Sequence, residues 1–252
     1  MGTSSSHSGN KDKKGLLPSD FGEQQSKPEV SWKTTKIGFS KYINGHGGSV
    51  GKTVKNYVKA SGGTEQLFRS SKSGVRGDVN IGRLFSDIQQ HGYQRTFDEL
   101  GIAYQGKSVK EICSGLVNYI VNSSDSKEDS VAKIAAVNAM ATIYEYMENN
   151  NLEIQSLDKV ENEMVEQILS TYVECYISGR ILNDLQFCLE KNSDDIDKTV
   201  KIEQEIKDYV SGKVTTTFQI KEIRDKIFGH QSIEVGIEQL HKKCYSVLED
   251  MV

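Results

Sequence analysis

The stretch SKEDSVAKIAAVNAMATIYEYMEN, residues 126–149, is typical of one long helix. Apolar residues recur along it every three or four positions, the spacing that gathers them on one helix face. Its alanine-rich centre favours a close crossing with a second helix, because small side chains let two helices approach. The residues expected to point inward are Val131, Ile134, Ala135, Met140 and Tyr144.

The same period recurs along most of the chain. It predicts helices over residues 49–60, 156–192, 196–228 and 232–251, with Gly179 as a candidate break in the second of these. Ser108 and Glu111 have the spacing of a capping box, which marks another helix start, and Thr64 is expected to cap a short helix. No proline follows Pro28, and strand-like alternation is scarce. The sequence therefore predicts a mainly α protein, a helical bundle.

Charge and glycine divide the chain unevenly. Residues 31–83 contain ten Lys or Arg and two acids, although the whole chain has a net charge of −4. We expect a flexible arm at 1–30, a basic Gly-rich helical module at 31–105 and an acidic all-α domain at 106–252. Residues 70–78 are expected to be a basic loop. The asymmetry fits either a partner-binding surface or two halves that attract each other.

The basic residues are the candidates for contact with a negatively charged surface. That surface is either nucleic acid or the acidic flank of a protein partner. Few aromatic residues lie among the basic ones, which disfavours sequence-specific recognition of bases. The residues assigned to it are Lys52, Lys55, Lys59, Arg69, Lys72 and Arg76.

Signals for catalysis are weak. The stretch GHGGSVGKT, residues 45–53, resembles a phosphate-binding loop, but His46 stands where the first glycine belongs. We therefore expect Lys52 not to bind ATP, and Ser49 to cap a helix. The histidines lack metal-ligand spacing and no nucleophile motif stands out. The sequence thus predicts a protein that is not an enzyme and holds no metal or resident cofactor.

Cysteine use and hydropathy indicate a cytoplasmic setting. The four cysteines, Cys113, Cys175, Cys188 and Cys244, are expected to be reduced thiols inside helices. No apolar run approaches the ~20 residues needed to cross a bilayer, and no secretory signal begins the sequence. We expect no contact with a membrane.

The first residues, Met1-Gly2-Thr3-Ser4-Ser5-Ser6, are the most suggestive segment. Removal of Met1 leaves Gly2 with an α-amine whose pKa is near ~8, so part of it is neutral and nucleophilic at pH 7. Glycine has no Cβ and can enter a narrow active site. The alternatives are a solubilising tail, a cloning remnant, or N-myristoylation at the formally matching Met-Gly-x-x-x-Ser.

A small apolar cluster follows in the same segment. Leu16-Leu17-Pro18, with Phe21 after it, has nothing nearby in sequence that would bury it. It is expected to dock either on a partner or on the chain's own body.

Several of these stretches resemble the QatB family of the bacterial Qat anti-phage system. They are residues 1–6, 16–19, 41–42, 47–49 and 57–59, followed by the order of a basic glycine-rich segment and acidic helices. The chain departs from the family where Asp20 and Phe21 stand and a Trp is expected.

The resemblance implies partners and a modification. Qat systems combine this family with an ATPase, a QueC-like enzyme and a TatD-like nuclease. A QueC-like enzyme that activates a 7-deazaguanine carboxylate would conjugate it to the amine of Gly2. Thr3, Ser4, Ser5, Ser6, Leu16, Leu17 and Pro18 would then contact the partner. The alternative function is a scaffold that binds the other defence proteins or nucleic acid with an unmodified tail.

Overall fold

The computed structural model describes residues 29–122, 126–193, 195–229 and 232–250. These residues form eleven α-helices and one 3-10 helix, with no strand among them, as the helical period predicted. In chain order the elements are α1 (Trp32–Ile43), α2 (Val50–Ala60), α3 (Gly63–Arg69), α4 (Lys72–His91), α5 (Tyr93–Leu100), α6 (Val109–Ile120), α7 (Lys127–Asn149), η1 (Ile154–Lys159), α8 (Asn162–Asn192), α9 (Ile196–Phe218), α10 (Lys221–Phe228) and α11 (Ile233–Asp250).

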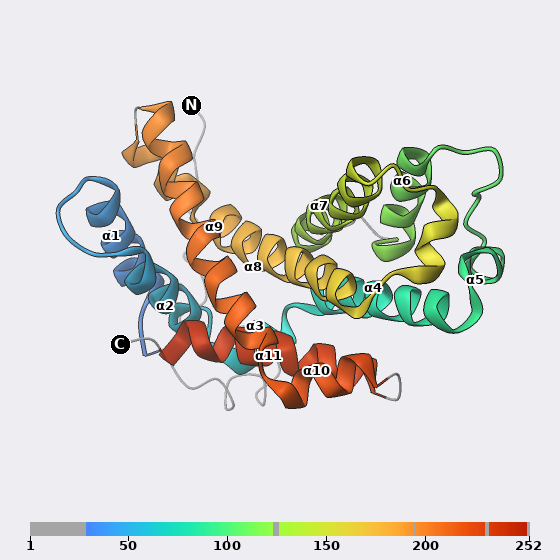
Figure 1. Cartoon of the computed structure of the whole chain (residues 1–252). Coiled ribbons are helices and arrows are strands. Elements are labelled where there is room, and N and C mark those ends of the chain that lie inside the picture. Colours follow the sequence, from blue (N-terminus) through green and yellow to red (C-terminus); the bar gives the residue numbers. More distant parts are fainter. Residues whose placement is uncertain (1–28, 123–125, 194, 230–231, 251–252) are drawn as a thin grey trace, which may run out of the picture.

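The longest helix, α8, runs through the middle of the molecule (Figure 1). It packs against α7 along one side and α9 along another, and also contacts α1 and α4. The last helix, α11, packs on α2, α3 and α4. Helices on both sides of residue 105 therefore contribute to one continuous hydrophobic core. The division of the chain at that residue stays a prediction.

The predicted long helix at 126–149 is confirmed as α7. Ser126 caps it in a capping box: the Ser126 side chain accepts a hydrogen bond from the Asp129 amide, and the Asp129 carboxylate accepts one from the Ser126 amide. Four of its five alanines are fully buried, and α7 packs closely on α8; the four are Ala132, Ala135, Ala136 and Ala139. One inward assignment is wrong. The alanine stripe takes the inner face, so Ile134 is turned outward and 62% exposed, whereas Tyr144 is partly buried and packs against the core.

Two of the predicted helix starts are confirmed and one is wrong. Ser49 accepts a hydrogen bond from the Lys52 amide at the start of α2, and Ser108 forms its capping box. Thr64 does not cap α3, because Gly62 occupies the cap position. Instead the Glu249 carboxylate, from α11, accepts hydrogen bonds from the Thr64 amide (2.9 Å) and hydroxyl (2.6 Å).

Helix breaks differ from expectation in two places. α8 continues through Gly179 without a break, and a Cβ added there would lie 3.2 Å from Val131 of α7. The glycine therefore serves the close helix crossing. The single helix expected over 196–228 is two helices, because α9 ends at Phe218 and α10 begins at Lys221.

The predicted loop at 70–78 is wrong, since α4 begins at Lys72. Glu128 of α7 accepts hydrogen bonds from the amides of Ser73 (2.8 Å) and Gly74 (3.1 Å), which satisfies the free end of the helix. Gly74 and Gly77 let α4 approach α8. A Cβ added at Gly77 would lie 2.1 Å from the Tyr172 hydroxyl oxygen. These glycines are packing residues and not loop residues.

Candidate functional site

The residues assigned to the N-terminal reaction lie outside the described part of the chain. They are Gly2, Thr3, Ser4, Ser5, Ser6, Leu16, Leu17 and Pro18. The functional assignment of these eight positions stays a prediction.

The six basic candidates come from two adjacent stretches. Lys52, Lys55 and Lys59 lie along one side of α2, at spacings of three and four residues. Lys59 pairs with Glu29, which raises the pKa of the Lys59 ammonium through a charged hydrogen bond. The other three, Arg69, Lys72 and Arg76, are exposed around the α3–α4 junction.

A partly buried arginine holds that junction in place. Arg180 of α8 donates to the hydroxyls of Ser70 and Ser71, each at 2.6 Å. The Ser71 hydroxyl is 2.8 Å from that of Tyr245 in α11. Because the backbone between α3 and α4 is tied to two other helices, Arg69 and Lys72 project from a fixed platform.

Part of the basic excess is neutralised inside the molecule. Arg83 of α4 pairs with Glu234 of α11 at 2.6 Å. The pair of Glu65 in α3 with Lys242 in α11, at 3.5 Å, has the opposite polarity and neutralises no basic residue of the stretch. The Arg83 pair joins the basic stretch to the acidic C-terminal helices. This favours the interpretation in which the two halves attract each other, while the exposed Lys52, Arg69 and Lys72 stay available as surface charge.

The sequence did not predict a buried pair of polar side chains, His241 and Asp78. The ring nitrogen Nε2 of His241 lies 3.0 Å from Oδ2 of Asp78, and both side chains are fully buried. Burial raises the pKa of the Asp78 carboxyl and outweighs the opposing hydrogen bond from His241. The pair lies inside the contact between α4 and α11, away from the surface of the described residues. The sequence signal that could have indicated its burial is the helical spacing of His241 from the apolar residues Ile237 and Cys244.

Three hollows lie in a line along α8. The largest, about 850 Å³, lies between α7 and α9. A second, of about 410 Å³, shares Glu174 and Ser211 with it. The third, of about 540 Å³, shares Glu163 and Arg224 with the second. Together they form one groove, here called the α8 groove, that follows α8 for about 40 Å.

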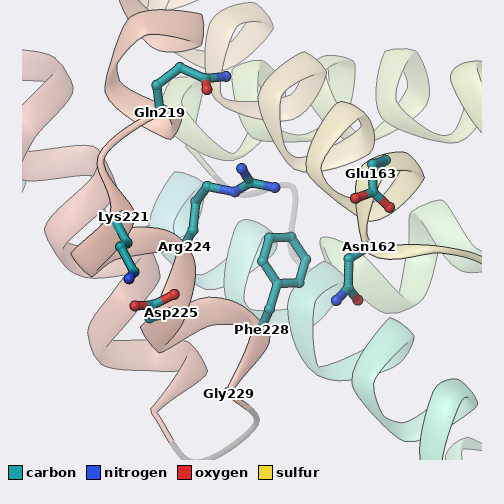
Figure 2. Close-up of a pocket in the computed structure, with 8 residues that line it drawn as sticks. All are labelled: Asn162, Glu163, Gln219, Lys221, Arg224, Asp225, Phe228 and Gly229. Atoms are coloured by element: carbon teal, nitrogen blue, oxygen red, sulfur yellow. The ribbon is translucent and has the colours of Figure 1, made fainter.

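The far end of the α8 groove lies where α10 meets the start of α8. Figure 2 shows Arg224 and Phe228 directed from α10 toward Asn162 and Glu163. Arg224 is fixed by an ion pair with Glu166 at 2.9 Å. This end is polar, and its arginine is held in a defined position.

The largest hollow, between α7 and α9, combines an apolar lining with an acidic rim. Its apolar residues are Val131, Ile134, Leu182 and Leu189, and Cys175 is also part of the lining. Four acids and one lysine accompany them: Glu174, Glu190, Glu203, Asp208 and Lys207. The groove therefore suits an amphipathic segment that carries positive charge. Sequence reasoning missed it because the lining comes from three helices.

Cys175 gives a test of this geometry. It is the one cysteine that is only partly buried, whereas Cys113, Cys188 and Cys244 are buried. We expect a thiol-alkylating reagent to label the native protein once, at Cys175. Labelling should be slow at neutral pH, since burial raises the pKa of this thiol to about 11. Peptide mapping reads the site, and early labelling of Cys113 would contradict the structure.

Two classes of feature are missing from the residues that the structure describes. Within 29–122, 126–193, 195–229 and 232–250, no three His, Cys, Asp or Glu side chains are grouped to hold a metal ion. No helix in these ranges is both long enough and apolar enough to span a membrane.

The fold and the α8 groove define an all-helical protein with an extended surface cleft. Residues 62–248 match the family model described as QatB, Qat anti-phage system associated protein. The chain belongs to the QatB family, and its role is in anti-phage defence. No curated protein and no solved structure matches it.

Proposed function

We propose that this protein is a non-catalytic subunit of a Qat defence system whose Gly2, after removal of Met1, is the target of a QueC-like partner. Family membership supports the defence setting. The match covers residues 62–248, so the N-terminal part of the proposal rests on the sequence Met1-Gly2-Thr3-Ser4-Ser5-Ser6 itself.

The proposed reaction is amide formation. The partner activates a 7-deazaguanine carboxylate with ATP, which gives an acyl adenylate and pyrophosphate. The neutral amine of Gly2 attacks the acyl carbon, AMP leaves with the bonding electrons, and the amine loses a proton. The enzyme supplies the activation, and this chain supplies an accessible amine. No step requires a catalytic side chain from the QatB-family subunit.

The folded body has the features of a binding partner. Arg69 and Lys72 project from the junction that Arg180 fixes, and the α8 groove offers a second contact surface. These surfaces suit the QueC-like enzyme, and also the ATPase or the TatD-like nuclease of the system. Contact with nucleic acid is a rival use of the basic surface.

The test is the intact mass of the protein after co-expression with its QueC-like partner. We expect a mass increase of one 7-deazaguanine acyl group, located on Gly2 by sequencing the N-terminal peptide. Protein made without the partner is the control and should begin with an unmodified Gly2. An unmodified terminus in protein that still binds the partner would support the scaffold function instead.

A further inference from the structure

The α8 groove leaves an apolar surface uncovered by any described residue. Ile134 lines its largest hollow and is 62% exposed, although isoleucine is normally buried. Leu182 and Leu189, from the turns of α8 between α7 and α9, contribute the floor. Grooves of this kind between helices are common docking sites for amphipathic segments.

The charge of the groove selects the kind of segment that fits. Glu174 and Glu190 come from α8, and Glu203 and Asp208 from α9, with Lys207 as the basic residue among them. An occupant with positive charge next to a short apolar run would place its cations near the acidic rim. Its apolar side chains would cover Ile134 and its neighbours.

We propose that the occupant is residues 11–21 of this same chain, KDKKGLLPSDF. This segment has Lys11, Lys13 and Lys14 before the apolar cluster of Leu16, Leu17 and Phe21, and with Asp12 and Asp20 its net charge is +1. The order of charge and apolar residues complements the groove. The sequence alone left two docking surfaces open for this cluster, a partner and the chain's own body, and the groove favours the second.

The connection to the body is long enough. The described chain begins at Glu29, which Lys59 holds beside α2. Eleven residues lie between Leu17 and Glu29, and the twelve chain steps span about 40 Å when extended, whereas a helix is about 10–12 Å across. A tethered segment has an effective concentration on the order of 1 mM, so a contact with a Kd of about 0.1 mM would be about 90% formed.

Docking at residues 11–21 has a consequence for the N-terminus. It anchors the middle of the arm and leaves residues 2–10 outside the groove, where an enzyme can reach Gly2. The inference does not depend on the proposed modification, because the groove and the segment are both present in the unmodified chain.

The experiment uses Cys175 as a natural probe in the groove. In the full-length protein, Ser19→Cys places a thiol inside the docking segment and keeps the apolar cluster intact. Under mild oxidation at low protein concentration we expect an intramolecular disulfide between positions 19 and 175, identified by peptide mapping. The triple variant Leu16→Asp/Leu17→Asp/Ser19→Cys is the matched control, since its tether and thiol are identical.

The rates decide the outcome. We expect the disulfide to form at least tenfold faster in Ser19→Cys than in the triple variant, and Cys175→Ser to eliminate it. Leu16→Asp/Leu17→Asp alone should speed alkylation of Cys175 severalfold. Equal disulfide rates in the two variants would overturn the proposal. Disulfide-linked dimers would overturn it too, because they would assign the groove to a second copy of the chain.

Discussion

Gly2→Pro is expected to abolish both the covalent modification and phage protection while leaving thermal stability near that of the wild type. Proline turns the terminal amine into a secondary amine and crowds its approach to an acyl carbon. The contacts among the described helices join residues from Glu29 onward, so the substitution alters none of these contacts. Intact mass, phage plaque counts and a thermal melt measure the three effects.

Two further variants separate the amine from the side chain. Gly2→Ala keeps a primary amine and should retain part of the modification. Extra residues ahead of Gly2 should abolish it, because the amine is then displaced from the partner's pocket. Full protection by Gly2→Pro in cells that contain all the partners would refute the N-terminal reaction.

The preference for Gly2 over lysine follows from protonation. With a pKa near ~8, about 10% of α-amines are neutral at pH 7, whereas a lysine with a pKa of ~10.4 is about 0.04% neutral. The neutral, nucleophilic fraction of the α-amine is therefore about 250 times that of a lysine side chain. Lysine side chains are therefore poor competitors even where they lie close to the partner. Myristoylation would instead give a lipid-sized mass.

Local sequence signals predicted those parts of the fold that local contacts determine. The helices at 49–60 and 126–149 and the capping box at Ser108 depend on side chains within a few residues of one another. Apolar period and capping therefore predicted them correctly.

Features that depend on distant residues were misread or missed. The start of α4 is capped by Glu128, more than fifty positions away, and Thr64 bonds to Glu249 at the far end of the chain. Asp78 and His241 are likewise 163 positions apart. The groove has the same origin, because α7, α8 and α9 each supply one part of it. A single sequence does not show which distant residues contact each other, so these contacts could not be predicted from it.

The glycines of α4 illustrate the error most clearly. The sequence predicts a basic loop around Gly74 and Gly77, and glycine weakens helices by about 1 kcal/mol relative to alanine. In the structure the two glycines face Tyr176 and Tyr172 of α8. The two tyrosine rings are stacked with centroids 6.4 Å apart. The close approach of α8 leaves no room for a Cβ at these two positions. The packing of α4 against α8 offsets the lower helix propensity of glycine.

Gly77→Ala should therefore destabilise the protein, although alanine is the better helix former. The new Cβ would lie 2.1 Å from the Tyr172 hydroxyl oxygen and 2.8 Å from ring carbon Cζ, so α4 or the ring must shift. Overpacking of a buried site costs about 1–3 kcal/mol, which exceeds the gain of about 1 kcal/mol in helix propensity at the upper end. We expect a net loss of about 2 kcal/mol, which lowers Tm by roughly 4–8 °C.

The matched controls are Gly115→Ala and Tyr172→Phe. Gly115 lies in α6 with nothing within 4 Å of an added Cβ, so alanine there should be neutral or stabilise the protein by up to about 1 kcal/mol. The Tyr172 hydroxyl is buried with no hydrogen-bond partner among the described residues, so its removal should cost little. It is also the atom nearest to the new Cβ. Gly77→Ala/Tyr172→Phe should therefore recover part of the lost stability in urea unfolding, and strictly additive effects would show that the hydroxyl is not the source of the clash.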